Sequence, residues 1–158
     1  MIFATISIII LFSLTVAGDQ LTPNARFQPA VSQSLVIHVT AYQWDFRFEY
    51  PNGANSTRQL YLPGNTTVMF NVTSTDVMHN FYLVQYRVSI DAIPGRYNII
   101  WITTPPVNGT SELSYKIICK ELCGPGHPYM ETPLTVMSQT AFNQWLSNQT
   151  TTNSTAGG

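Results

Sequence analysis

The segment CKELCGPGHPYM, residues 119–130, contains the highest concentration of chemically reactive side chains in the sequence. It holds the only two cysteines, Cys119 and Cys123, together with His127 and the thioether of Met130. Gly and Pro residues favour tight turns in this stretch. Thiolate, imidazole and thioether groups are all ligands of transition metals. Four such donors on one turn-rich loop therefore predict a metal site.

Several kinds of site would use part of this donor set, and His79 in VMHNF is a further candidate on a separate predicted strand. Outside the cytoplasm, Cys119 and Cys123 would ordinarily form a small disulfide loop, which leaves both histidines and the methionine unexplained. A structural zinc site uses two thiolates and two imidazoles but gains little from a thioether. A mononuclear blue-copper site takes one cysteine, two histidines and a methionine, and has no role for a second cysteine.

Two thiolates that each bridge a pair of copper ions account for every donor. The two sulfurs and two metals form a rhomb, in which each metal takes one imidazole and has room for one weak outer ligand. Thiolate softness selects copper. Sharing of one electron across the pair changes the geometry little between redox states, so the donor set favours fast one-electron transfer.

Short β-type runs separated by turn residues must position these ligands. In residues 44–50 aromatic and charged residues alternate with the period of a half-buried strand. Pro-Gly and Asn-Gly turn signals bound the runs. Eight runs at this spacing predict an all-β, Greek-key β-sandwich. The predicted strands are residues 34–41, 42–50, 58–63, 66–73, 79–86, 97–103, 112–119 and 132–137.

The composition restricts the classes of function. Only 9% of the 158 residues are charged and the formal net charge is -1, which argues against a nucleic-acid partner. Asn-x-Ser/Thr sequons indicate an outward-facing surface that is open to glycosylation. The sequons begin at Asn55, Asn65, Asn71, Asn108, Asn148 and Asn153.

The first 18 residues are apolar, with no charge before Asp19. A helix of this length spans roughly 26 Å, just short of a hydrocarbon core, and we interpret it as a membrane anchor. A secretory signal is the alternative, but its positively charged n-region is missing. Both interpretations place the rest of the chain outside the cytoplasm. The expected organisation is an anchor (1–18), a linker (19–33), the β domain (34–139), and a short helix with an unstructured tail (140–158).

These motifs resemble subunit II of the haem–copper terminal oxidases, the cytochrome c oxidase family. CKELCGPGHPYM resembles the binuclear, CuA-type copper loop, and VMHNF resembles the strand that carries the first histidine. AYQWDF (41–46) resembles the aromatic segment where electrons enter, and DAIPGR (91–96) a further family stretch. The resemblance covers residues 34–139 and implies a cupredoxin fold. The single anchor resembles the shorter prokaryotic members, and the sparse charge points to an acidic habitat and an archaeal source.

The resemblance also implies a role for each candidate residue. Trp44 is expected where electrons enter, and Asp91 and Arg96 are expected to face the catalytic subunit. The Glu121 side chain is expected to reach a Mg²⁺ ion at that contact, since a hard carboxylate oxygen suits this ion. The implied ligands of the two copper ions are His79, Cys119, Cys123, His127, Met130 and the main-chain carbonyl of Glu121.

The implied function is that of an electron-transfer subunit at the outer face of the plasma membrane, with no turnover of its own. It passes electrons from an external donor to a haem in catalytic subunit I, where oxygen is reduced. The donor is a cytochrome c, a blue-copper protein or a membrane haem protein. Because carboxylates are few and scattered, we expect docking by apolar and dipolar contacts. The alternatives are the copper domain of a nitrous-oxide-reductase-like enzyme, and a binding module with a Cys119–Cys123 disulfide.

Overall fold

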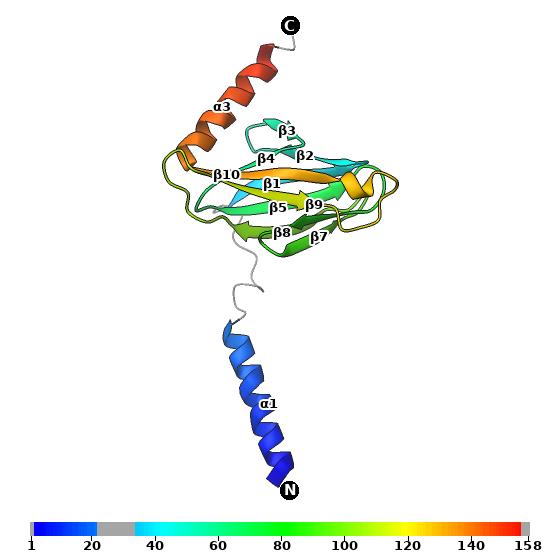
Figure 1. The fold of residues 1–158 in the computed structure, drawn as a ribbon, viewed down its shortest axis with the longest axis vertical. Coiled ribbons are helices and arrows are strands. Elements are labelled where there is room, and N and C mark those ends of the chain that lie inside the picture. Colours follow the sequence, from blue (N-terminus) through cyan, green and yellow to red (C-terminus); the bar gives the residue numbers. More distant parts are fainter. Residues whose placement is uncertain (1, 22–33, 156–158) are drawn as a thin grey trace. The chain divides into compact units, whose positions relative to one another are not determined.

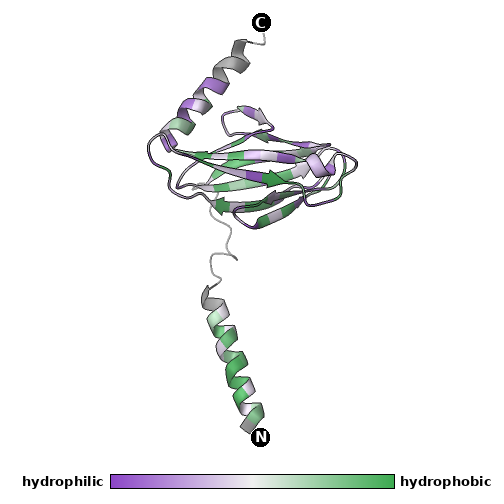
Figure 2. Ribbon diagram, viewed as in Figure 1, coloured by the Kyte–Doolittle hydropathy of each residue, from purple (hydrophilic) through white to green (hydrophobic). Residues whose placement is uncertain are grey.

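The computed structural model describes residues 2–21 and 34–155. These residues fall into two compact units, an N-terminal helix and a β domain. Helix α1, Ile2–Leu21, extends three residues beyond the predicted segment 1–18, and residues 22–33 of the predicted linker lie outside the described residues. Most described residues of α1 are hydrophobic (Figure 2), and its large apolar side chains are exposed. Among the described residues, no helix combines the length and the mean hydropathy that a membrane span requires.

The β domain is a sandwich of two five-stranded sheets, which confirms the predicted all-β architecture (Figure 1). The first sheet has the order β3-β2-β1-β5-β8 and the second the order β4-β10-β9-β6-β7. In the first sheet the strands are β1 (Leu35–Tyr42), β2 (Asp45–Glu49), β3 (Asn55–Thr57), β5 (Thr67–Ser74) and β8 (Asn98–Thr103). In the second they are β4 (Leu60–Pro63), β6 (His79–Leu83), β7 (Val88–Ala92), β9 (Glu112–Ile118) and β10 (Glu131–Met137).

Each of the eight predicted runs contains a strand, but β3 and β7 were not predicted. The predicted strand 79–86 ends at Leu83, and a turn leads into β7. The turn has no Gly or Pro and is made instead by Arg87, which adopts a left-handed φ of 55°. Turn signals based on Gly and Pro could not detect it.

Aromatic rings fill the space between the sheets because alternate residues of each strand face inward. The ring of Phe81 on β6 lies 5.5 Å from that of Phe46 and 5.3 Å from that of Phe70, in edge-to-face geometry. Phe48 packs on the same ring from 6.4 Å. These contacts connect three strands from both sheets and hold the loops at the ends of the sandwich in fixed positions.

Helix α3, Gln139–Thr155, follows β10 and covers one end of the core. The ring of Trp145 lies 4.9 Å from that of Tyr50 and 4.6 Å from that of Tyr61, while Phe142 is buried. The predicted short helix is therefore present. It is also longer than expected, since it includes residues that the sequence analysis assigned to the tail.

The β-sandwich has two ends, each formed by the turns and loops that connect its strands (Figure 1). We call one the thiol end: it consists of the turn 43–44, the loop 75–78 and the loop 119–130, which follow β1, β5 and β9. We call the other the sequon end: it consists of the turn 64–66 and the connection 104–111, which precede β5 and β9.

Candidate metal site

The loop 119–130 connects the antiparallel strands β9 and β10 at the thiol end. Ile118 pairs with Glu131 in the ladder, and the Cys119 amide donates to the carbonyl of Met130 at 3.1 Å. The base of the loop is therefore an extension of the sheet. This pairing brings Cys119 and Met130 together, although eleven positions separate them in the sequence.

The tip of the loop is folded back by tight turns. His127 opens a 3₁₀ turn, His127–Tyr129, and its amide donates to the carbonyl of Gly124 at 3.0 Å. Gly124 has a φ of 113°, a conformation that side-chain-bearing residues rarely adopt. The turns direct the His127 ring toward the Cys123 sulfur.

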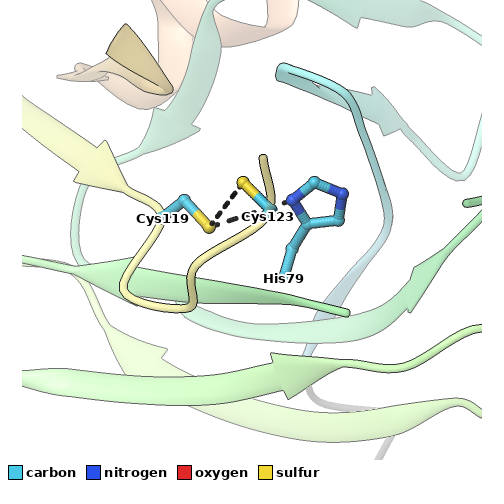
Figure 3. Close-up of side chains that lie close together, drawn as sticks. All are labelled: His79, Cys119 and Cys123. Atoms are coloured by element: carbon cyan, nitrogen blue, oxygen red, sulfur yellow. Dashed lines mark hydrogen bonds between the residues drawn. The ribbon is translucent and has the colours of Figure 1, made fainter. Parts of the chain in front are cut away.

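The two thiols lie at the centre of the site (Figure 3). Their Sγ atoms are 3.7 Å apart and both cysteines are free, whereas a disulfide needs about 2.05 Å. His79, the first residue of β6, places Nδ1 at 3.8 Å from Cys119 Sγ. The donor atoms of His79, Cys119 and Cys123 all lie within 4.8 Å of one another.

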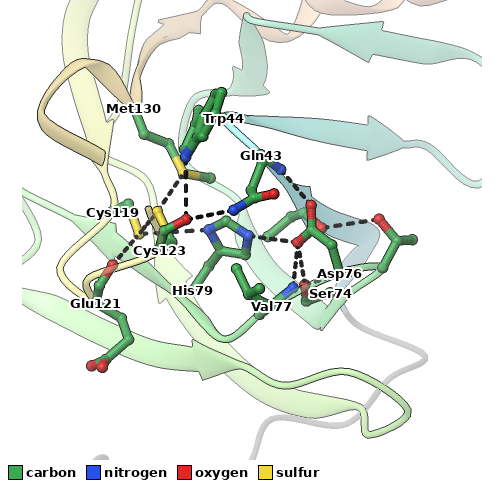
Figure 4. Close-up of polar contacts among 12 residues, drawn as sticks. Gln43, Trp44, Ser74, Asp76, Val77, His79, Cys119, Glu121, Cys123 and Met130 are labelled. Atoms are coloured by element: carbon green, nitrogen blue, oxygen red, sulfur yellow. Dashed lines mark hydrogen bonds and ion pairs between the residues drawn. The ribbon is translucent and has the colours of Figure 1, made fainter. Parts of the chain in front are cut away.

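The other three expected ligands surround the same pair of sulfurs, and Figure 4 shows two of them, Glu121 and Met130. His127 Nδ1 lies 3.6 Å from Cys123 Sγ, and Met130 Sδ lies 3.8 Å from it. The carbonyl of Glu121 lies 3.2 Å from Cys119 Sγ, while the Glu121 carboxylate points away from the sulfurs. The structure therefore brings all six predicted donors together.

The ligand side chains are largely shielded from solvent, which favours binding of a cation by this donor set. His79, Cys119, Cys123 and Met130 are buried and His127 is half-buried. Burial, reinforced by the neighbouring Cys119 thiol, raises the pKa of Cys123 to about 12. Two adjacent buried thiolates repel each other unless a cation lies between them. Soft sulfur donors with two imidazoles fit copper, so the residues present fit the expected group.

Asp76 fixes the orientation of the His79 ring. Its Oδ1 atom lies 2.8 Å from His79 Nε2, so the opposite nitrogen, Nδ1, faces the sulfurs. Asp76 also accepts hydrogen bonds from the amides of Gln43 and Val77, both at 2.6 Å. Burial opposes ionisation of Asp76, but these hydrogen bonds outweigh it and lower the pKa of the carboxyl group. A carboxylate behind a histidine is common in metal sites, because it sets the ring's tautomer and direction. The sequence analysis did not predict this role.

Trp44 lies in the turn between β1 and β2 and packs on the loop 119–130. Its Nε1 donates to the carbonyl of Cys123 at 3.2 Å, and Gln43 Nε2 donates to the same oxygen at 2.8 Å. A Cβ atom at Gly126 would lie only 2.3 Å from Trp44 Cδ2, so the indole is in close contact with that glycine. The indole remains 40% exposed and thus connects solvent with the backbone of a candidate ligand.

Asp45, next to Trp44, attaches this turn to the second sheet. It is buried and accepts hydrogen bonds from Arg58 Nε at 2.6 Å and from Thr132 Oγ1 at 3.1 Å. Thr132 lies on β10, two residues after Met130. The position of Trp44 above the loop is therefore fixed on two sides, and sequence patterns alone gave no sign of this second attachment.

Asp91 and Arg96 lie near the thiol end but outside the ligand cluster. Asp91 on β7 pairs with Asn80 in the ladder and accepts a hydrogen bond from its side chain at 2.7 Å. Its carbonyl accepts another from Asn98 at 2.7 Å. Within the part of the chain that the structure describes, Asp91 and Arg96 form no ion pair with each other.

A β-sandwich with two free thiols, two imidazoles and a thioether at one end belongs to the class of metal-binding sandwich domains. Residues 53–138 match the family model described as cytochrome c oxidase subunit II, periplasmic domain. The chain therefore belongs to the subunit II family of the haem–copper oxidases.

Individual relatives agree with this assignment. The chain is 36% identical over 137 residues to heme-copper oxidase subunit 2 of Aeropyrum pernix, covering 85% of this chain and 57% of the relative. It is 31% identical to the probable cytochrome c oxidase subunit 2 of Rickettsia prowazekii, covering 96% of this chain and 54% of the relative. The crystal structure of the periplasmic domain of cytochrome oxidase subunit II from Bradyrhizobium japonicum superposes with a TM-score of 0.71 at 26% identity, covering 80% of this chain and 99% of that one. The chain thus spans a little over half the length of these curated relatives.

Proposed function

We propose that this chain is the electron-transfer subunit of a respiratory haem–copper oxygen reductase. It accepts electrons from an external donor and passes them to a haem in catalytic subunit I, where oxygen is reduced. The observation that carries the proposal is the convergence of two imidazoles, a thioether and a carbonyl oxygen on one pair of buried sulfurs 3.7 Å apart. The matched family and the two relatives are oxidase subunits, which favours this function over the nitrous-oxide-reductase-like alternative.

Two copper ions are the proposed cofactor. Cys119 and Cys123 would hold both ions, His79 and Met130 would hold one of them, and His127 and the Glu121 carbonyl would hold the other. When bound, the copper pair supplies reversible one-electron exchange. The protein supplies a fixed donor set: the loop base is part of a sheet, and the carboxylate of Asp76 holds His79 in place. Rigid ligands keep the geometry alike in both redox states, which lowers the barrier to electron transfer.

Trp44 is the proposed point where electrons enter. Its indole is partly exposed on one side and hydrogen-bonded to the Cys123 backbone on the other, which gives a short route from the surface to the site. Leu122 and Tyr129 are 80% and 85% exposed on the loop 119–130, and Tyr129 lines a surface pocket together with Trp44.

The exposed side chains of Trp44, Leu122 and Tyr129 support docking with little help from charge. A blue-copper protein or a membrane-held haem protein with an apolar patch is the proposed donor. We expect the rate of electron transfer from such a donor to change less than about twofold between low and physiological ionic strength. A rate that falls steeply with added salt would show that charged contacts dominate.

Asp91 and Arg96 are the proposed contacts with the catalytic subunit. Both side chains are exposed near the thiol end, and Asp91 lies on the strand that pairs with the His79 strand. The Glu121 carboxylate points out of the site on the same loop as the thiols, as a Mg²⁺ ligand at a subunit contact must.

Helix α1 is the proposed membrane attachment, with the β domain on the outer face. Its support is the row of exposed apolar side chains along the helix and the periplasmic nature of the matched family domain. Protease accessibility of the β domain in intact cells tests the orientation.

Electron paramagnetic resonance of the copper-loaded chain tests the cofactor. One unpaired electron shared by two equivalent copper nuclei gives a seven-line hyperfine pattern, and one copper ion gives four lines. Copper analysis should find two ions per chain. A chain isolated with one ion and a four-line signal, or with a disulfide and no copper, would contradict the proposal.

A further inference from the structure

The sequons of this chain are unevenly distributed over the domain. In five of them the asparagine side chain is described, and in four of these five it is exposed. All four exposed asparagines lie outside the thiol end. The exposed residues are Asn55, Asn65, Asn108 and Asn148, whereas Asn71 is half-buried.

The strand directions place two of them at the sequon end. Strand β5 begins at Thr67, directly after the Asn65 turn, and ends at Ser74, just before the loop that leads to His79. Strand β9 begins at Glu112, soon after Asn108, and ends next to Cys119. Strands of this length span about 25 Å. Asn65 and Asn108 are therefore separated from the thiols by the full length of the sandwich.

Asn65 and Asn108 lie on two segments that contact each other. The Asn65 amide donates to the carbonyl of Pro105 at 3.0 Å, and a Cβ atom at Gly64 would lie 2.9 Å from the amide nitrogen of Val107. Asn65 has a left-handed φ of 52°, and Gly109 after Asn108 has one of 65°, so both side chains project from tight turns. Within the described residues, neither side-chain amide has a hydrogen-bond partner.

Asn71 provides an internal contrast. It lies within β5, which is hydrogen-bonded to β1 on one side and to β8 on the other. Its side-chain amide lies 3.4 Å from His38 Nδ1. The Asn71 backbone and side chain are thus engaged in the folded sheet, while those at the sequon end are accessible.

We propose that Asn65 and Asn108 are N-glycosylation sites and that Asn71 is not modified. The donor is an oligosaccharide carried on a lipid phosphate. A bond forms between the asparagine amide nitrogen and the anomeric carbon of the sugar. The bond from that carbon to the lipid phosphate oxygen breaks, the phosphate leaves with the electron pair, and the amide nitrogen loses one proton. The proposal depends on the outer-face location above and not on the copper site.

The placement has a functional consequence. Glycans at the sequon end would cover a surface with little charge, while the thiol end stays clear for the electron donor and the catalytic subunit. Modification at these positions is therefore compatible with assembly of the oxidase.

Mass spectrometry of the full chain from its native membranes tests the proposal. Glycopeptides should carry a glycan at Asn65 and at Asn108, and the peptide with Asn71 should be bare. Asn65→Gln and Thr110→Ala should each remove one glycan from the intact mass. Thr110→Ser retains the sequon and should keep the glycan at Asn108, which separates loss of the motif from a change in folding.

Two results would overturn the proposal: unmodified Asn65 and Asn108 in the native chain, or a glycan at Asn71. Copper content and the hyperfine pattern of the same preparation are measured in parallel. Because these signals do not depend on glycosylation, failure of this inference is distinguishable from failure of the proposed function.

Discussion

The two ends of the sandwich are held together by similar kinds of contact that serve different purposes. At the sequon end, short segments are joined by backbone hydrogen bonds such as Asn65 to Pro105, and by the Thr104 hydroxyl, which donates to the Pro63 carbonyl at 2.7 Å. At the thiol end, side chains from one loop reach the backbone of another: Gln43 and Trp44 both donate to the Cys123 carbonyl. A connection that only links strands needs little more than a turn, whereas a loop that holds ligands needs support from its neighbours.

Both ends also use a glycine where two segments meet, but with different consequences. Gly64 leaves room for the backbone of residues 105–107, and Gly126 leaves room for the Trp44 indole. The first contact affects only packing, while the second also sets the distance between an exposed aromatic ring and the thiol loop. Substitutions at the two ends should therefore have similar effects on folding and different effects on the copper site.

The largest effect is expected when a bridging thiol is removed. Cys119→Ser should abolish the seven-line signal and lower the copper content to one ion per chain or fewer, because an alcohol does not bridge two copper ions as a thiolate does. Cys123→Ser should do the same, since the proposal makes both sulfurs ligands of both ions. Copper analysis and paramagnetic resonance measure the loss. If either variant kept the seven-line signal, the bridging role of its sulfur would be wrong.

The second effect is a change in copper affinity when the carboxylate behind His79 is removed. Asp76→Asn keeps the size of the side chain but removes the charge that orients the His79 ring. Loss of such a partner typically lowers metal affinity about 10–100-fold. Competition with a copper chelator measures it. Asp91→Asn is the matched control, because Asp91 contacts Asn80 and no ligand. Equal affinities in the two variants would rule out an orienting role for Asp76.

The candidate site was more predictable from sequence than the contacts that support it. The ligands could be recognised because cysteines are rare in this chain, and because a thioether close to thiols and an imidazole is a donor combination typical of copper sites. Asp76 lies three residues before His79, where a local carboxylate could have been noticed. The contact between Gly126 and Trp44 joins residues 82 positions apart, and no periodicity or motif records such a pairing.

The fold likewise contains elements that sequence patterns predict and elements that they miss. Alternation of apolar and polar residues identified eight of the ten described strands, since each must present one face to the core. Strand β3 has only three residues, too few for a periodic signal. Strand β7 was missed because the turn before it depends on the left-handed conformation of Arg87, a residue type that rarely marks turns.

The third effect compares the two glycines directly. Gly126→Ala should lower the free energy of unfolding by about 1–3 kcal/mol and displace the Trp44 ring, because overpacking forces neighbouring groups to shift. Gly64→Ala should cost a similar amount, since its Cβ atom would meet the Val107 amide. Chemical denaturation measures both. Only Gly126→Ala should slow electron transfer from a small redox dye to the copper site. Equal slowing in both variants would mean that global destabilisation, not Trp44, controls the rate.

The smallest effect is a pH-dependent loss of stability that comes from Tyr50, remote from the ligands. Burial raises the pKa of Tyr50 to about 12, although a hydrogen bond that the Tyr61 amide donates to the Tyr50 hydroxyl oxygen partly opposes the shift. The folded state therefore keeps its proton over a range in which the unfolded chain, with an ordinary pKa near 10, loses it. Stability from this group is fully present below pH 10 and is lost as the pH rises toward 12. Between pH 10 and 11 the decrease is about 1 kcal/mol.

Substitution of one hydroxyl isolates this contribution from the other tyrosines. Tyr50→Phe should be less stable than the parent at pH 8, because it leaves the amide and carbonyl of Tyr61 without their partner. Its stability should also fall less steeply between pH 10 and 11. Tyr129→Phe at the thiol end removes an exposed hydroxyl and should retain the parent slope. If urea denaturation gave the same slope for Tyr50→Phe and the parent, alkaline sensitivity would have to arise at another buried group, such as Tyr86, whose pKa is also raised by burial.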